Sequence, residues 1–260
     1  MPETPLRLER EGDVAVLTID NPPLNLFDRP MFDALVARAE ELTAAPPRAL
    51  LIRAEGRVVS AGVDVQEFHG LTAAQGGDLW RTLLAPVHRI EALPCPTIFA
   101  AHGLTLTAAF ELALGCDLIV AGSRARFGLV ETVVGLTPSM GGPQRLAERA
   151  GSGRARELVM TAELFGAETL ERWNVVNRVW PDDEVDARAR ELAARLAAGP
   201  TRAHDATKRI VRAWCDGGVA QADAVVPEVS GALFETEDLR TAVAAFLERG
   251  PQHGTRYVGR

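Results

Sequence analysis

The chain has 260 residues, a formal net charge of −7 and a sequence pI near 5.4. Hydrophobic residues make up 47% of it and aromatic residues only 5%, which suits one or two globular domains with an aliphatic core. An acidic chain that has no basic run and only one lysine, Lys208, argues against a nucleic-acid partner.

The cysteines and the apolar runs bear on the cellular compartment of the protein. Cys95, Cys116 and Cys215 show no metal-ligand spacing and lie among apolar residues, which predicts buried free thiols in a reducing compartment and no metal site. The N-terminal residues lack the basic and apolar regions of a signal peptide. No apolar run reaches the roughly 18 residues of a membrane span. We therefore expect a cytoplasmic protein with no membrane partner.

Strand and helix signals alternate over the first two thirds of the chain. Residues 14–19 are predicted to form a strand, and residues 30–42 have apolar side chains at helical spacing. Further buried strands are predicted at residues 49–53, 97–101 and 118–121. Strands that alternate with helices favour parallel pairing through crossovers, so we expect an α/β fold.

From about Asp182 onward the strand signals stop. Four helices are predicted, at residues 182–198, 200–214, 219–234 and 237–247, with Asp182 as the N-cap of the first. We expect this helical tail to pack on its own core or on a neighbouring subunit. Its predicted buried face consists of Phe234, Leu239, Val243, Phe246 and Leu247.

Two loops that follow predicted strands carry small and polar residues. One runs over residues 56–65, and the other over residues 102–107, before a short predicted helix at residues 108–114. The N-terminus of such a helix presents free N–H groups that suit a negatively charged oxygen. Glu111 lies one turn inside this helix, and Glu131 precedes a Gly- and Pro-rich loop. Carboxyl groups in these places can transfer protons.

The order of these segments resembles the enoyl-CoA hydratase/isomerase (crotonase) family over nearly the whole chain. The matching pieces stand in the family's order, and together they are far more specific than any one of them. They are Ser60 to Asp64, Glu111, Cys116-Asp117, Phe127-Gly128, Glu131, Gly141-Gly142, Gln144-Arg145-Leu146, Thr236-Glu237-Asp238 and Ala245-Phe246-Leu247.

The resemblance implies a fold and an assembly. It implies an α/β fold with a crotonase-like ββα spiral core and a helical C-terminal region, assembled as a homotrimer or a dimer of trimers. Residues 1–195 would bind acyl-CoA and perform catalysis, and residues 196–260 would serve oligomerisation and cover the site. No cofactor is implied, because CoA is part of the substrate.

The resemblance also implies residue roles. The backbone N–H groups of Val63 and Ala108 would form an oxyanion hole, and Glu111 and Glu131 would be the paired acid–base carboxyl groups. Residues implied to contact the substrate are Ala61, Val63, Asp64, Val65, Gln66 and Ala108. Hydratase members use two glutamates at these positions, whereas many isomerase members keep only one.

Several side chains have a plainer interpretation beside the functional one. Glu111 could lie on a surface helix, but its apolar neighbours favour a buried helix. Glu131 could be an ordinary loop carboxylate. Asp64 is predicted to cap or turn its loop, Arg145 to form a structural ion pair, and His102 to be a hydrogen-bonded loop residue. For Arg29 and Arg57, which lie near the predicted ligand loops, a CoA phosphate contact and a solvated surface charge both stay open.

Two other motifs fit their families poorly. Gly151-Ser152-Gly153 begins like a dinucleotide loop, but Arg156 stands where the last glycine is needed and no strand precedes it. Residues 137–141 end like a nucleophile elbow but lack its first glycine.

The chain departs from the family pattern near the predicted site. Thr107-Ala108-Ala109 stands where the family usually has glycines, and alanine keeps the N–H while adding a methyl group. Residues 66–84 are expected to line the acyl pocket, although their apolar side chains could equally belong to the core.

These features predict an enoyl-CoA hydratase that adds water through an enolate stabilised by the oxyanion hole. The alternatives are another reaction of the family, such as isomerisation or hydrolysis, and a non-catalytic subunit that binds acyl-CoA.

Overall fold

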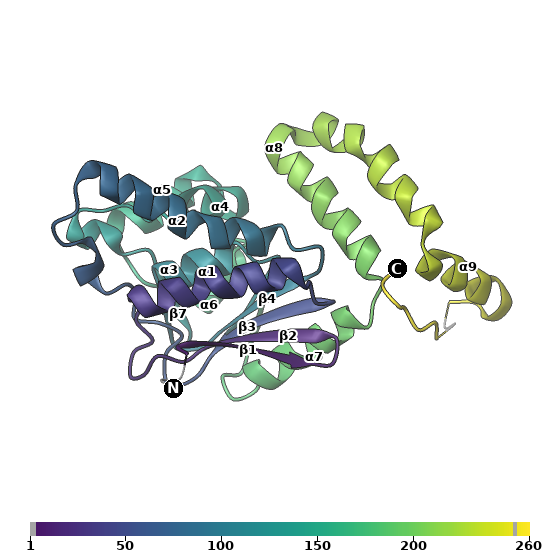
Figure 1. Cartoon of the computed structure of the whole chain (residues 1–260), viewed down its shortest axis with the longest axis horizontal. Helices are drawn as coiled ribbons and strands as arrows, with labels where there is room; N and C mark the ends of the chain where they lie inside the picture. The colour runs from purple at the N-terminus through teal and green to yellow at the C-terminus, as the bar shows by residue number, and fades with distance from the viewer. Residues whose placement is uncertain (1–3, 252–253) are drawn as a thin grey trace.

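The computed structural model describes residues 4–251 and 254–260 (Figure 1). Its main sheet has six strands in the order β1-β2-β3-β4-β6-β9. Their bounds are Leu6–Glu11 (β1), Val14–Ile19 (β2), Ala49–Ala54 (β3), Thr97–Ala101 (β4), Leu118–Gly122 (β6) and Arg178–Trp180 (β9). Strand β1 pairs antiparallel with β2, and the other neighbours are parallel. The four predicted strands are therefore confirmed, whereas β1 and β9 were not predicted.

Both faces of the main sheet are covered, which explains why its inner strands β2, β3, β4 and β6 are mostly apolar. Successive side chains of a strand point to opposite faces. In β3, Leu50 and Ile52 join the large core cluster, and Ala49 and Leu51 join a second cluster behind the sheet. The second cluster is covered by helix α7 (Val185–Ala197), which contacts β2, β3, β4 and β6.

The other face of the main sheet carries the remaining helices of the core and a small second sheet. The helices include α1 (Arg29–Ala44), which confirms a predicted helix, and α2 (Ala73–Glu91). The second sheet has the order β5-β7-β8, with bounds Leu104–Leu106, Arg126–Gly128 and Phe165–Gly166. Two further helices, α5 (Ser152–Thr161) and α6 (Ala167–Arg172), flank β8.

The chain winds repeatedly through a strand of the main sheet, a strand of the small sheet and then a helix. One turn is β4, β5 and α3 (Ala108–Leu114), and the next is β6, β7, η2 (Glu131–Val134) and α4 (Gly142–Ala150). The turn before them leaves β3, passes the bridge between Ser60 and Thr105, and enters η1 (Val65–Phe68) and α2. This is the predicted ββα spiral, and it places the ends of successive turns side by side.

The C-terminal helices extend away from the core (Figure 1). Helix α8 (Thr201–Gly231) is interrupted by non-helical backbone at Gly217 and Gly218, where two helices were predicted to separate. A short turn, η3 (Ala232–Glu235), then leads to α9 (Glu237–Arg249). The boundary predicted between residues 195 and 196 lies at the end of α7, three residues before its C-cap, and the division into two functional regions stays a prediction.

The predicted buried face of the tail is largely uncovered in the single chain. Phe234 is 75% exposed and Leu247 is 80% exposed, and Val243 and Phe246 are about half exposed. Helix α9 instead buries Asp238 and Ala245. Asp238 is buried because its carboxylate accepts N–H bonds from Val258 and Gly259 of the C-terminal segment, at 2.6 and 2.9 Å.

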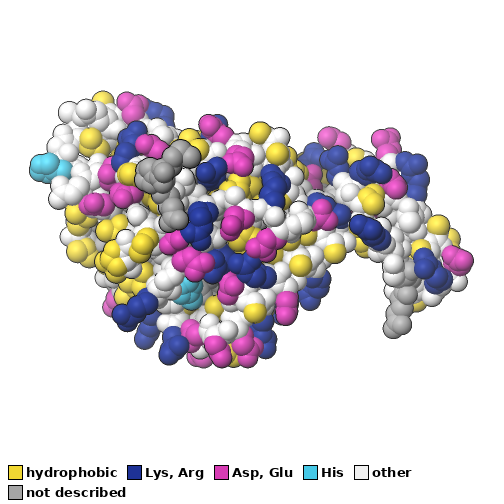
Figure 2. Space-filling view, turned by 60° about the horizontal axis from the view of Figure 1, so that its bottom comes forward, with side chains coloured by type: hydrophobic (Ala, Val, Ile, Leu, Met, Phe, Trp, Pro, Cys, Tyr) yellow, Lys and Arg dark blue, Asp and Glu magenta, His cyan; other side chains and the backbone are white. Residues whose placement is uncertain are grey.

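Two smaller predictions also need correction. Asp182 does not cap α7, which begins at Val185, because its carboxylate accepts bonds from Ser123 and Arg124 instead. Cys95 and Cys116 are buried free thiols as predicted, but Cys215 is only partly buried. Among the described residues, no helix is long and apolar enough to cross a membrane. Basic and acidic side chains intermingle over the face shown in Figure 2.

Candidate active site

Two loops from successive turns of the spiral meet in register. Ser60 donates its N–H to Leu104 O at 3.0 Å, and Leu106 donates its N–H to Ser60 O at 3.1 Å, so Ser60 and Thr105 form a parallel bridge. Val63 and Ala108 each follow three residues after this pair. The structure therefore brings together the two segments whose N–H groups were predicted to form an oxyanion hole.

The N–H groups of Val63 and Ala108 both lack a backbone partner among the described residues. Phe27 binds on either side of Val63, donating its N–H to Gly62 O and accepting the N–H of Asp64, at 2.9 and 3.0 Å. The N–H of Val63 lies between these two bonds and has no acceptor in the described part of the chain. Ala108 is the first residue of α3, where a helix leaves its N–H groups without internal partners.

Thr107 adopts an unusual backbone conformation just before α3. Its φ of 47° and ψ of −122° lie in a region that a β-branched residue rarely occupies. Its N–H donates to Gly128 O at 3.0 Å, and its Oγ1 is buried without a hydrogen-bond partner among the described residues. The position of a Cβ on Gly62 would be 3.2 Å from this hydroxyl. Sequence reasoning noted the missing glycines here but not the strain.

The other residues predicted to contact the substrate lie along the first loop. Ala61 donates its N–H to Leu24 O at 3.0 Å, which holds the loop against the turn after β2. Asp64 caps η1, because its Oδ1 accepts the N–H of Gln66 at 3.0 Å, as predicted. Val65 and Gln66 are exposed, so they form an open rim beside Val63.

Glu111 is buried and firmly held. Only 2% of the residue is exposed, and its Oε1 accepts N–H bonds from Met140 and Gly142, both at 2.8 Å. Burial, together with the nearby Glu131 charge, raises the pKa of Glu111 to about 8. The two N–H donors and the Arg145 cation oppose this rise without cancelling it.

Glu131 starts the turn η2 and faces the same place. Burial raises the pKa of Glu131 to about 7. Its Oε2 is buried and has no hydrogen-bond partner in the described part of the chain. Such an oxygen suits a water molecule or a substrate group. The structure thus brings the two predicted carboxyl groups close enough for the charge of one to act on the other.

The glycines after η2 are required by the packing around Glu111. A Cβ on Gly142 would come within 2.9 Å of Cγ and Oε1 of Glu111. Gly141 has a φ of 102°, which favours glycine. Sequence reasoning identified this glycine pair as part of a family motif but did not foresee that the backbone N–H of Gly142 binds Glu111.

The plainer interpretations of Arg145 and His102 are confirmed. Arg145 forms a two-bond ion pair with Glu91, and His102 Nε2 lies 3.0 Å from Gly56 O. Gly151 separates the helices α4 and α5, so no strand precedes the dinucleotide-like motif. Arg29 pairs with Asp33 and its side chain is 66% exposed, which leaves its role toward CoA a prediction. Among residues 4–251 and 254–260, no His, Cys, Asp or Glu side chains are grouped to hold a metal ion.

The proposed acyl-pocket residues differ in burial. Phe68 and Trp80 pack against each other with ring centroids 5.5 Å apart, and Leu79 and Trp80 lean on the core. Leu83 belongs to the core and Leu71 is 40% exposed. Phe68 of η1 and Leu79 and Trp80 of α2 therefore remain the candidates for acyl contact.

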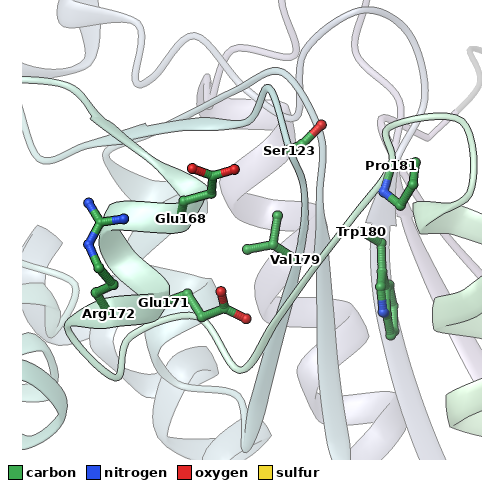
Figure 3. Close-up of a pocket in the computed structure, with 7 residues that line it drawn as sticks. All are labelled: Ser123, Glu168, Glu171, Arg172, Val179, Trp180 and Pro181. Carbon is green, nitrogen blue, oxygen red and sulfur yellow. The ribbon is translucent and has the colours of Figure 1, made fainter.

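A hollow of about 550 Å³ lies elsewhere, between α6 and β9 (Figure 3). Glu168, Glu171 and Val179 face one another across it, whereas the Trp180 ring projects on the other side of the strand. The hollow shares no residue with the two loops or the glutamate pair, so its size does not make it the reaction site.

Comparison with known proteins agrees with this geometry. The profile of the enoyl-CoA hydratase/isomerase family matches residues 9–255. The chain belongs to the enoyl-CoA hydratase/isomerase family.

Relatives and solved structures of this family match nearly the whole chain. A short-chain-enoyl-CoA hydratase from Clostridium acetobutylicum is 32% identical, with 93% of this chain and 94% of the relative covered. A crotonyl-CoA hydratase from Syntrophomonas wolfei is 29% identical, with 93% and 94% covered. The crystal structure of an enoyl-CoA hydratase subunit from Geobacillus kaustophilus superposes with a TM-score of 0.91 at 32% identity, covering 98% of each chain. The predicted crotonase fold is confirmed.

Proposed function

We propose that this member of the family is an enoyl-CoA hydratase, which adds water across the double bond of a 2-enoyl-CoA thioester. The observation that carries the proposal is the pairing of Glu111 and Glu131. Glu111 is buried, Glu131 is partly buried with its Oε2 enclosed, and their pKa values lie near 8 and 7. Hydration requires two proton transfers, and a second glutamate in this position supplies the second one.

The thioester oxygen is expected to lie between the N–H groups of Val63 and Ala108. When water attacks Cβ, negative charge moves onto this oxygen, and two fixed N–H donors stabilise it by several kcal/mol. The donors are ready before the reaction, because Phe27 fixes the first loop and Gly128 fixes Thr107. Stabilisation therefore requires little rearrangement.

The glutamate pair is expected to hold about one proton between pH 7 and pH 8, because one pKa lies near each value. Oε1 of Glu111 accepts two N–H bonds, so a proton on this residue belongs on Oε2. One carboxylate can then accept a proton from water while the other carboxyl group gives a proton to Cα. The pKa values describe the pair as a unit, so we do not assign the two roles separately.

Crotonyl-CoA in water labelled with oxygen-18 provides the direct test. We expect a 3-hydroxyacyl-CoA product with the label on its Cβ oxygen. A double-bond isomerase would instead convert a 3-enoyl-CoA without incorporating the label, and a hydrolase would release free CoA. Absence of labelled product over a range of acyl chain lengths would overturn the proposal.

A non-catalytic acyl-CoA-binding subunit is the second candidate. The substitution of Thr107, Ala108 and Ala109 for the usual glycines favours it, since the added side chains take up space near the thioester. Such a subunit would bind acyl-CoA in calorimetry and convert none of the esters.

The hydratase proposal includes acyl-CoA as the only small-molecule partner, in a cytoplasmic protein without a cofactor.

We further propose that the chain assembles as a homotrimer or a dimer of trimers. The uncovered apolar side chains of the tail, above all Phe234 and Leu247, support an interface there. Leu247→Asp should reduce the assembled mass in light scattering or equilibrium sedimentation. Thr241→Asp adds the same charge at an exposed position on another side of α9 and should leave the mass unchanged. Equal masses for both variants would contradict an interface at Leu247.

A further inference from the structure

The peptide that joins Gly141 to Gly142 is held at both of its ends. Its N–H donates to Oε1 of Glu111 at 2.8 Å, and its carbonyl oxygen accepts a bond from Nη1 of Arg145 at 3.2 Å. A trans peptide is planar, so its N–H and C=O are rigidly joined and point in opposite directions. The location of Arg145 therefore determines the direction from which this donor meets Glu111.

Arg145 is itself firmly anchored. Its Nε and Nη2 donate to the two carboxylate oxygens of Glu91, the last residue of α2, at 3.0 and 2.6 Å. Such two-bond pairs fix the guanidinium plane as well as its place. The side chain of Arg145 is only 5% exposed. A buried arginine is thus fixed between the end of α2 and the turn that holds Glu111.

The C-terminal region also contacts the pair of Arg145 and Glu91. Arg212 of α8 donates to Oε1 of Glu91 at 3.3 Å, the same oxygen that accepts Arg145 Nε. Glu91 therefore connects α8 with the interior of the core. The series of contacts runs from Arg212 through Glu91 and Arg145 to the Gly141 carbonyl, and from there to Glu111.

The glycine at position 141 makes this arrangement sterically feasible. A Cβ there would overlap Nη1 of Arg145. The guanidinium occupies the space that a side chain would need. Its positive charge next to the carbonyl polarises the peptide, which strengthens the N–H bond on the other end. The same charge lowers the pKa of Glu111 against the effect of burial.

We propose that Arg145, anchored by Glu91, is a positioning residue for the reaction, and that Arg212 makes its hold on the Gly141–Gly142 peptide depend on the docking of α8. Arg145 does not touch the reacting atoms. It acts by fixing the donor that orients Glu111. The kinetic reading of this inference rests on the hydratase activity proposed above.

Arg145→Lys tests the geometry and Arg145→Gln tests the charge. Lysine keeps a cation but cannot bind Glu91 with two bonds and Gly141 with a third. We expect it to lower kcat for crotonyl-CoA about ten- to hundredfold and to change KM much less, because a misplaced catalytic group is costly even for small displacements. Glutamine should also move the pH–rate profile to higher pH, since loss of the cation raises the pKa of Glu111.

Arg149→Lys is the matched control. Arg149 lies one turn further along α4 and donates to the carbonyls of Cys116 and Val175, and it makes no bond to the Glu111 turn. A merely structural role for Arg145 predicts that both lysine variants lower Tm while neither changes kcat per folded enzyme or the pH profile. That outcome would overturn the proposal.

Substitutions at exposed residues of α8 test whether the position of Arg145 depends on this helix. Arg212→Gln should lower kcat two- to fivefold, the range that corresponds to an exposed ion pair of at most about 1 kcal/mol. Arg209→Gln is its control, because Arg209 lies on the same helix, is equally exposed and pairs with Glu228 at 3.7 Å. Equal kcat values in the two variants would remove Arg212 from the proposal.

A readout without turnover separates this inference from the proposed function. Carbon-13 NMR of labelled glutamate Cδ, with Glu111 assigned through Glu111→Gln, follows the titration of Glu111 directly. We expect Arg145→Gln to raise its pKa and Arg149→Lys to leave it unchanged. If the wild type hydrates no enoyl-CoA, the proposed hydratase function is wrong. The titration of Glu111 still tests whether Arg145 positions this residue. An unchanged titration in Arg145→Gln would overturn the positioning role.

Discussion

The backbone of Gly142 lies directly against the catalytic candidate Glu111. Its N–H donates to Oε1 of Glu111 at 2.8 Å, and a Cβ on this glycine would approach Cγ and Oε1 within 2.9 Å. The turn after η2 therefore determines both the place of the carboxyl group and the space left around it.

Gly142→Ala should lower both stability and activity. The added methyl group has to displace Glu111 or the turn, and overpacking of this kind typically costs 1–3 kcal/mol. We expect a lower Tm together with a loss of kcat beyond the loss of folded protein. Gly153→Ala is the control, because a Cβ there meets nothing within 4 Å in helix α5. It should be neutral or slightly stabilising, as measured by thermal unfolding and crotonyl-CoA turnover.

Thr107→Gly should stabilise the protein. Glycine adopts the observed φ of 47° without strain, and the substitution also removes a buried hydroxyl that has no partner. Release of about 1–3 kcal/mol of strain exceeds the entropic cost of a glycine in the unfolded chain, which is under about 1 kcal/mol. Thr207→Gly, in the ordinary helical backbone of α8, should instead lower Tm. A lower Tm for both variants would contradict the strain at Thr107.

Glu111→Gln and Glu131→Gln should each reduce hydration strongly. Each substitution removes acid–base assistance, which is typically worth about 10²–10⁴-fold in rate. The double variant should lose much less than the product of the two single losses, because both residues act on one water. Affinity for acyl-CoA should persist. The measurement is turnover of a 2-enoyl-CoA and a 3-enoyl-CoA by all four proteins. Isomerisation that survives in one single variant, with no hydration by the wild type, would indicate a one-base isomerase.

Glu111 should also make the stability depend on pH. Its pKa rises from an ordinary 4.5 to about 8 on folding, so between these values the folded state binds more protons than the unfolded state. Stability must therefore fall as pH rises through this window. Between pH 5 and pH 8 the raised pKa of Glu111 lowers the free energy of unfolding by an amount on the order of a few kcal/mol. We expect Glu111→Gln to exceed the wild type in Tm at pH 8 and to differ little at pH 5. Glu163→Gln, at an exposed site, should give the same small difference at both pH values.

The sequence was sufficient for the core of the fold because its signals are local. Val14–Ile19 and Ala49–Ala54 are continuous apolar runs, and such runs predict buried strands directly. Strand β1 was missed because its buried side chain is Leu6 alone, followed by exposed charged residues. Helix α2 was not predicted from the sequence, although Thr72 and Gln75 form a capping box at its start.

The site was predictable in its residues but not in its supports. Glu111 and Glu131 stand at positions that a family pattern identifies. The bonds from Met140 and Gly142 to Glu111 come from backbone N–H groups some thirty residues away, and no side-chain type reports them. What covers the apolar face of the tail could not be predicted for a related reason. Amphipathic spacing shows which face of α9 is apolar, but not whether the partner that covers it belongs to the same chain.

Lys208 carries the only lysine amine of the chain, and this amine is occupied. Its Nζ lies 2.9 Å from the Asp117 carboxylate and donates to the Cys95 carbonyl at 2.9 Å, which ties α8 to the core. Thioesters acylate free amines without any enzyme, whereas arginine side chains remain protonated and inert. Because the one lysine amine is already paired, the chain offers an acyl thioester no unpartnered lysine to modify.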